Sequence, residues 1–206
     1  MRRAATTGGL LIGIFGLVLQ FVLSMQMSAG VGRSVLASIE FFFSFFTVLT
    51  NIAAALVYTA VLSGHPAWFT RPPVATAVAV AISVVSITYA TILAQLWQPA
   101  GWLFVADATL HYVAPVVFVL WWLAFGRSGT SRLADIPRWL AYPLIYLAFV
   151  MLRGTMLAQY PYPFLDLTVK STSQVATASV LMLGLFLIVS LAAVAADRML
   201  PAPGHH

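Results

Sequence analysis

Charged residues are scarce in this chain, and cysteine is absent from it. Of its 206 residues, 7% are charged and 62% are hydrophobic, whereas a soluble domain is about 25% charged and about 45–50% apolar. So few charges do not cover the surface of a soluble protein of this length. Without cysteine there is no disulfide scaffold, no thiolate metal site and no cysteine nucleophile. The composition therefore excludes a soluble enzyme, a disordered chain and a secreted disulfide-rich protein.

Long apolar stretches make up most of the sequence. A helix needs about 20 apolar residues to cross the hydrocarbon core of a bilayer. Six stretches qualify, and Gly and Pro residues punctuate most of the breaks between them, as is typical of loops. The predicted spans cover about residues 8–29, 35–63, 74–97, 102–125, 138–158 and 172–196. We therefore predict an all-α integral membrane protein, in which residues 1–200 form a single bundle of six transmembrane helices and residues 201–206 form a tail that includes tag remnant.

The basic residues predict the orientation of this bundle. Cytoplasmic loops of membrane proteins carry an excess of Lys and Arg. One side of the predicted bundle carries Arg2, Arg3, Arg71, Arg127, Arg132, Arg138 and Arg198, and the other side carries Arg33 and Lys170. We expect both termini to be cytoplasmic, in a multi-pass protein of the plasma (inner) membrane. Because the basic residues are scattered rather than clustered, we expect no binding to nucleic acid.

Polar side chains inside the predicted spans are few, and they recur at helical spacing. In the second span, spacings of four, three and four residues put a set of them on one helical face. This set is Glu40, Ser44, Thr47 and Asn51. Asp107 and His111 lie one turn apart in the fourth span. The fifth span and the loop after it add Tyr142, Tyr146, Arg153 and Asp166.

The depths of these residues predict two layers. With a rise of about 1.5 Å per residue, Glu40, Asp107 and Arg153 each lie about 8 Å from the outer end of their span. We expect Arg153 to face both carboxylates, which lowers the cost of holding each of them in the membrane. By the same rise, Thr47 and His111 lie about 13–18 Å from the outer ends. They can therefore meet beneath the charged layer.

A threonine hydroxyl beside an imidazole is a candidate nucleophile–base pair. A Thr hydroxyl is a weak nucleophile until a neighbouring base takes its proton, and Asp107 can either orient His111 or cap the fourth helix near its start. The same residues also have structural interpretations. A Thr in a membrane helix often bonds its own i−4 carbonyl, a buried histidine often makes a structural hydrogen bond, and Asn51 can join two helices.

The remaining charged residues and the histidines do not indicate a further catalytic or metal site. Glu40 and Arg153 can form a purely structural ion pair. Apart from the C-terminal pair, His65 and His111 are the histidines of this chain, and they are too few for a persuasive zinc or haem site. We expect no metal ion and no cofactor.

Three segments resemble a known family of membrane proteins. They are the second-span segment 45–51 (FFTVLTN), the fourth-span segment 110–115 (LHYVAP) and the turn 162–166 (YPFLD). With the number and order of the spans, they resemble a family of bacterial six-transmembrane proteins that is distantly similar to the animal androgen-induced and androgen-dependent (ADTRP-like) membrane proteins. The animal proteins are intramembrane threonine hydrolases that cleave fatty acid esters of hydroxy fatty acids.

The resemblance implies roles for two residues. The nucleophile of the animal proteins is a Thr of the second span that follows an aromatic residue, which matches Thr47 better than Thr50. Their histidine precedes a proline in the fourth span, which matches His111, although here Pro115 comes four positions after His111. Thr50 therefore remains the alternative nucleophile.

The leading hypothesis is an intramembrane hydrolase of fatty-acid-ester-type lipids. Thr47 attacks the ester carbonyl and His111 moves its proton. The expected donors to the oxyanion are Ser44, Asn51 or Tyr146, and the expected polar mouth is formed by Glu40, Asp107, Arg153 and Asp166. The alternative is a non-enzymatic lipid-binding or transport protein that uses the same polar cavity. Both hypotheses make a membrane lipid or fatty-acyl compound the partner, and neither specifies the oligomeric state.

Overall fold

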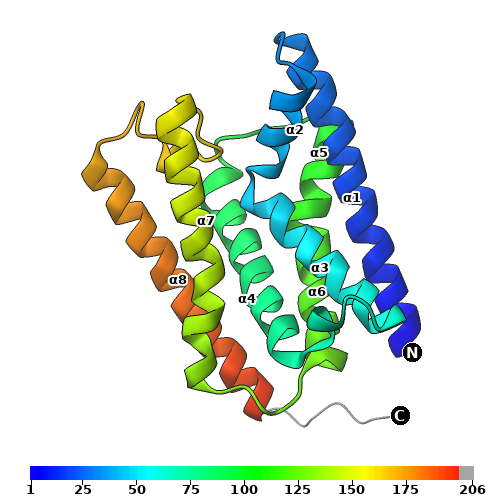
Figure 1. Cartoon of the computed structure of the whole chain (residues 1–206). Coiled ribbons are helices and arrows are strands. Elements are labelled where there is room, and N and C mark those ends of the chain that lie inside the picture. Colours follow the sequence, from blue (N-terminus) through cyan, green and yellow to red (C-terminus); the bar gives the residue numbers. More distant parts are fainter. Residues whose placement is uncertain (200–206) are drawn as a thin grey trace.

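The fold is a bundle of long helices. The computed structural model describes residues 1–199, and the predicted tail 201–206 lies outside the described residues. Six helices of the described part are long and apolar enough to cross a membrane: Arg2–Gly30, Phe46–Ser63, Pro72–Leu93, Trp102–Gly126, Leu133–Leu157 and Thr172–Met199. They run roughly alongside one another (Figure 1). This agrees with the prediction of an all-α, multi-pass membrane protein.

Local breaks divide some of these helices into shorter elements. The α-helices are α1 (Arg2–Gly30), α2 (Val35–Phe43), α3 (Phe46–Ser63), α4 (Pro72–Thr88), α5 (Trp102–Ala108), α6 (Ala114–Trp121), α7 (Ile136–Leu157) and α8 (Thr172–Met199). π-Helical turns cover Tyr89–Leu93, Thr109–Val113 and Trp122–Gly126. Short 3₁₀ turns cover Ala67–Thr70, Leu133–Asp135 and Pro163–Leu165.

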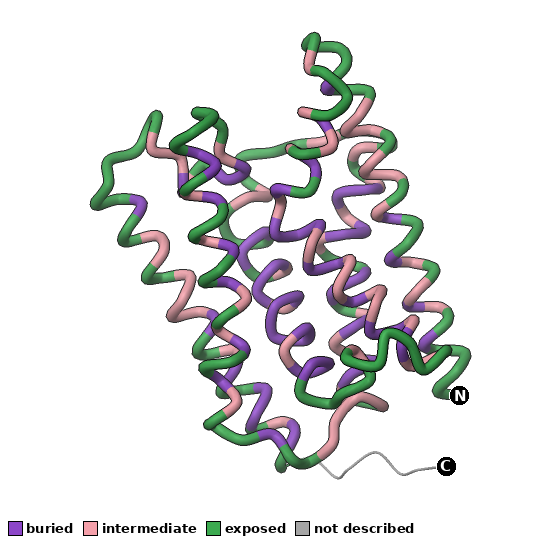
Figure 2. Tube along the Cα trace, viewed as in Figure 1, coloured by how far each residue is buried: buried purple, intermediate pink, exposed green. Residues whose placement is uncertain are grey.

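Helix α4 lies at the centre of the bundle. Its buried residues are mostly Val and Ala, whose small side chains let neighbouring helices approach closely. Pro72 and Pro73 start this helix, where a missing backbone N–H costs nothing. Figure 2 shows buried positions along α4 and exposed ones along the outer sides of α1 and α8, which are the sides left for lipid.

The second predicted span is broken near the site. Helix α2 ends at Phe43 and α3 begins at Phe46, with an extended residue, Phe45, before it. The Ser44 hydroxyl donates to the Phe41 carbonyl at 2.6 Å, and such local bonds compete with helix hydrogen bonds. Tyr146 donates to the Ser44 carbonyl at 2.8 Å, which satisfies a polar group that the break exposes.

This break corrects the prediction of one continuous helix over 35–63. Glu40 and Ser44 do not share a helical face with Thr47 and Asn51, because the chain changes direction between the two pairs. Thr47 instead lies in the first turn of α3. The backbone N–H groups of a first helical turn have no partner within the helix, so the break places N–H groups that are not engaged along the helix beside the Thr47 hydroxyl.

Glycine allows α1 to approach α3 closely. A Cβ atom at Gly9 would lie 2.5 Å from Cζ of Tyr58, whereas one at Gly8 would meet nothing within 4 Å. We expect Gly9→Ala to lower the melting temperature of the purified protein, because overpacking costs about 1–3 kcal/mol. Gly8→Ala is the matched control and should leave the melting temperature unchanged or raise it slightly. Equal melting temperatures for the two variants would contradict this packing.

Candidate functional site

Thr47 and His111 lie in contact inside the bundle. Thr47 Oγ1 is 3.3 Å from His111 Nε2. Thr47 is buried in the first turn of α3, and the His111 side chain is 15% exposed in the π-helical turn that follows α5. The distance is within the range expected of a nucleophile–base pair before substrate binds.

The other ring nitrogen of His111 faces acceptors. Its Nδ1 lies 3.0 Å from the Asp107 carbonyl oxygen and 3.3 Å from Asp107 Oδ1. Because both partners accept hydrogen bonds, we assign the ring proton to Nδ1. Nε2 is then unprotonated and can accept a proton from the Thr47 hydroxyl. Asp107 thus orients the imidazole in the tautomer that a general base requires.

Tyr89 completes this arrangement, and sequence analysis missed it. The Tyr89 hydroxyl donates to Asp107 Oδ2. Its ring stacks on the His111 ring with centroids 3.8 Å apart and an interplanar angle of 18°. The imidazole is therefore held both by Asp107 and by an aromatic face. Tyr89 lies in the third predicted span. None of the other predicted site residues lies in that span, so no helical spacing connects Tyr89 to them.

Pro115 helps to explain the irregular backbone around His111. At the end of the π-helical turn Thr109–Val113, the Ala114 N–H bonds to the Thr109 carbonyl, five residues back. Pro115 has no N–H, so it cannot donate to the Leu110 carbonyl. Asn51 Nδ2 donates to that carbonyl instead, at 3.2 Å. Single π-helical turns often occur at functional sites.

Tyr162 is the second functional residue that sequence analysis missed. It is buried in the loop between α7 and α8, and its hydroxyl accepts the Thr47 backbone N–H at 3.3 Å. The same hydroxyl lies 3.5 Å from Thr47 Oγ1. Burial raises the pKa of the Tyr162 phenol, which therefore keeps its proton. The turn around Tyr162 belongs to the family resemblance, but no helical spacing connects a loop residue to Thr47.

The three predicted oxyanion donors point elsewhere. Asn51 Nδ2 donates to the Thr47 carbonyl at 2.9 Å as well as to Leu110. The hydroxyls of Tyr146 and Ser44 also donate to backbone carbonyls, as described for the break. These residues hold the backbone around the site, and their protons are engaged. The Tyr162 hydroxyl, 3.5 Å from Thr47 Oγ1, and the positive end of the α3 dipole are better placed to stabilise an oxyanion beside Thr47.

The predicted layer of charges is divided into separate contacts. Arg153 Nε donates to Glu40 Oε1 at 2.9 Å, and its Nη1 donates to the Gln159 carbonyl at 2.9 Å. Asp107 instead pairs with His111. The prediction that Arg153 faces two carboxylates is therefore wrong. The lateral distance between helices, which sequence depth does not report, separates Arg153 from Asp107.

Asp166 and Thr50 have local partners. Asp166 Oδ1 accepts from the Thr168 backbone N–H at 2.8 Å and from the Thr168 hydroxyl at 2.6 Å, which closes its own turn. Asp166 thus does not join the predicted polar mouth. Thr50 Oγ1 lies 3.1 Å from the Tyr142 hydroxyl. Tyr142 is not a general base at neutral pH, so Thr47 is the better placed hydroxyl for nucleophilic attack.

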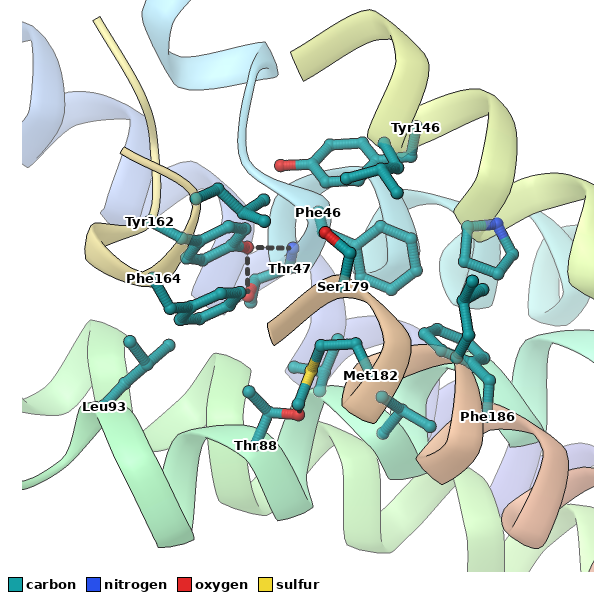
Figure 3. Close-up of a pocket in the computed structure, with 16 residues that line it drawn as sticks. Phe46, Thr47, Thr88, Leu93, Tyr146, Tyr162, Phe164, Ser179, Met182 and Phe186 are labelled. Carbon is teal, nitrogen blue, oxygen red and sulfur yellow. Dashed lines mark hydrogen bonds between the residues drawn. The ribbon is translucent and has the colours of Figure 1, made fainter. Parts of the chain in front are cut away.

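Thr47 lies between two cavities. The larger one has a volume of about 460 Å³ and is lined by His111 and Asp107 together with residues of α1, α2 and α5. The smaller one has a volume of about 90 Å³ and is lined mainly by apolar residues of α4, α7 and α8. Thr47 and Tyr162 line both. Figure 3 shows the smaller cavity, with the hydrogen bond between Thr47 and Tyr162 at one side of it.

Comparisons with known proteins leave the family open. No family model, curated protein or solved structure matches this chain. Within residues 1–199, no cluster of three or more His, Asp and Glu residues has the arrangement of a metal site. The chemistry is therefore inferred from the contacts around Thr47.

Proposed function

We propose that this protein is an intramembrane lipid-ester hydrolase with a threonine nucleophile. The observation that carries the proposal is the 3.3 Å contact between Thr47 Oγ1 and His111 Nε2 at the junction of two cavities. The pairing of His111 with Asp107 supports it. The resemblance of the segments around Thr47 and His111 to intramembrane threonine hydrolases points to the same chemistry.

The first half of the reaction transfers the acyl group to Thr47. His111 Nε2 takes the Thr47 proton while Oγ1 attacks the ester carbonyl carbon. The bond between this carbon and the alcohol oxygen then breaks. The leaving alkoxide takes the proton from His111 and departs as an alcohol. The acyl group remains on Thr47 as an ester.

The second half returns the enzyme to its starting state. A water molecule attacks the acyl-threonine carbonyl and gives a proton to His111. The bond to Thr47 Oγ1 breaks, the proton returns to that oxygen, and a carboxylic acid leaves. Asp107 stabilises the imidazolium in both halves by accepting its Nδ1 proton.

Charge on the carbonyl oxygen is stabilised by the first turn of α3 and by Tyr162. The positive end of a helix dipole lies at this turn. The Tyr162 hydroxyl accepts the Thr47 N–H and keeps its own proton for donation.

This arrangement predicts the effect of removing the Tyr162 hydroxyl. We expect Tyr162→Phe to lower kcat by about 10²-fold with little change in KM, because the lost donor acts on the transition state. Steady-state hydrolysis of a soluble ester in detergent micelles gives both constants. Tyr160→Phe removes a hydroxyl from the same loop and is the control. A lower kcat for both variants alike would assign Tyr162 a structural role.

The proposal includes the orientation of the bundle. The start of α1 and the end of α8 lie at the same end of it, and α3, which carries Thr47 in its first turn, runs toward that end from further inside the bundle (Figure 1). The arginine distribution supports cytoplasmic termini in the plasma (inner) membrane. The site then lies in the outer half of the bilayer, where a lipid substrate can reach it.

A second candidate function is lipid binding or transport without chemistry. The break between α2 and α3 beside a cavity of about 460 Å³ favours it, because broken helices often form transporter binding sites. Covalent capture separates the two functions. A fluorophosphonate probe applied to the purified protein in lipid nanodiscs should form an adduct on Thr47, located by mass spectrometry of peptides. An unmodified protein, or an adduct at another residue, would contradict hydrolysis by Thr47.

A further inference from the structure

The two cavities around Thr47 differ in the chemistry of their walls. The larger contains His111 and Asp107, and three polar residues of α1 face it: Gln20, Ser24 and Ser28. The smaller contains neither His111 nor Asp107, and apart from Thr47 its polar side chains are hydroxyl-bearing residues of a mainly apolar wall. An ester held at Thr47 has two arms that lead away from the reacting carbon. One cavity is available for each arm.

The position of His111 decides which arm enters which cavity. In the first half of the reaction, His111 gives its proton to the oxygen of the departing alcohol. That oxygen must therefore lie within hydrogen-bond reach of Nε2. Of the two cavities, His111 lines the larger one and not the smaller one. The alcohol arm accordingly extends into the larger cavity, and the acyl arm extends away from His111.

We propose that the smaller cavity is the acyl-binding pocket and that it restricts this enzyme to esters of short acyl chains. This inference rests on the proposed hydrolase function. The acyl group that Thr47 receives stays in the smaller cavity until water releases it as a carboxylic acid, while the alcohol leaves through the larger one. The apolar wall suits a hydrocarbon chain.

The volume limits how much of that chain the pocket can enclose. An apolar cavity of about 150 Å³ holds benzene, a molecule of six carbons. By the same ratio, a pocket of about 90 Å³ holds a chain of about four carbons. The larger cavity, at about 460 Å³, takes a much longer alcohol.

Two residues of α8 limit the pocket. Phe186 is buried and packs edge-on against Phe46, with ring centroids 5.8 Å apart. In Figure 3 it lies on the opposite side of the pocket from Tyr162. Met182 Sδ accepts a hydrogen bond from the Thr88 hydroxyl at 3.6 Å across the pocket wall. Neither residue touches the reacting atoms in this arrangement, so truncation lengthens the pocket and leaves the nucleophile in place.

The test uses p-nitrophenyl esters, because the leaving group is constant while the acyl chain varies. Acetate, butyrate, octanoate and palmitate esters are compared by kcat/KM in nanodiscs, with activity of the Thr47→Ala protein subtracted. For the wild type we expect butyrate to exceed palmitate by about ten-fold or more. Phe186→Ala should move the optimum toward octanoate. Met182→Ala should also move the optimum toward octanoate, and it provides the test if the Phe186→Ala protein does not fold.

Leu103→Ala is the matched control, because Leu103 lines only the larger cavity. It should leave the optimum acyl length at butyrate. A wild-type optimum at palmitate overturns the pocket assignment, and so does an acyl profile that moves with Leu103→Ala rather than with the α8 variants. Neither result contradicts the proposal that Thr47 hydrolyses esters. The absence of Thr47-dependent hydrolysis of every ester would instead remove the proposed function itself.

Discussion

Replacing Thr47 with alanine is expected to lower ester hydrolysis by about 1,000-fold or more and to abolish covalent labelling by a fluorophosphonate. The hydroxyl 3.3 Å from His111 Nε2 is the atom that would form the acyl bond, and alanine has no group to replace it. His111→Gln should cause a loss of similar size, because the hydroxyl then lacks a base. The double variant should be no less active than either single variant, since the two residues act as a unit.

Two further variants make this expectation specific. Thr47→Ser keeps the hydroxyl and should retain measurable hydrolysis and labelling. Thr50→Ala removes the neighbouring hydroxyl that contacts Tyr142, and it should be labelled as strongly as the wild type. Persistent labelling of both Thr47→Ala and His111→Ala proteins would refute the assignment. Loss of labelling in Thr50→Ala alone would make Thr50 the nucleophile.

Asp107→Asn is expected to lower kcat by about 10²–10⁴-fold while the protein remains folded. Asparagine has nearly the shape of aspartate, but its amide nitrogen can donate to His111 Nδ1. That contact favours the tautomer with its proton on Nε2, and this nitrogen then cannot accept the Thr47 proton. The kinetic constants and the melting temperature of the variant, measured in the same detergent, separate this effect from unfolding.

Tyr89→Phe is the companion variant for Asp107→Asn. It removes the hydroxyl that donates to Asp107 but keeps the ring stacked on His111. We expect a smaller loss of kcat than in Asp107→Asn, because the carboxylate still accepts the Nδ1 proton. If Asp107→Asn kept a wild-type kcat, the contact between Asp107 and His111 would be structural only.

The position of Thr47 at the start of a helix links the fold to this chemistry. A threonine in mid-helix has neighbours whose N–H groups are already bonded along the helix. At the first turn of α3 those groups are unpaired within the helix. The break between α2 and α3 therefore creates, in one step, an accessible hydroxyl and nearby donors. Ser44 and Tyr146 stabilise that break by donating hydrogen bonds to backbone carbonyls.

Helical spacing predicts contacts within one helix, whereas membrane depth predicts only part of the contacts between helices. Asp107 and His111 are expected on one helical face because they are four residues apart, and the structure has them in contact. Depth predicts that Arg153 faces both Glu40 and Asp107, but the structure pairs Arg153 with Glu40 and Asp107 with His111. Depth gives one coordinate, whereas a contact between helices also needs their order and rotation. Tyr162 could not be found at all in this way, because it lies on a loop.

The amino-acid sequence alone is enough to show a multi-pass helical membrane protein. That conclusion needed only local facts, because each apolar stretch is long enough to satisfy its own backbone hydrogen bonds and to match the bilayer. Three features come from the folded structure: the second span breaks before Thr47, Tyr162 and Tyr89 lie beside the site, and Thr47 lies between two cavities. These features depend on how side chains from remote helices fill space together, and a single helix does not encode that packing.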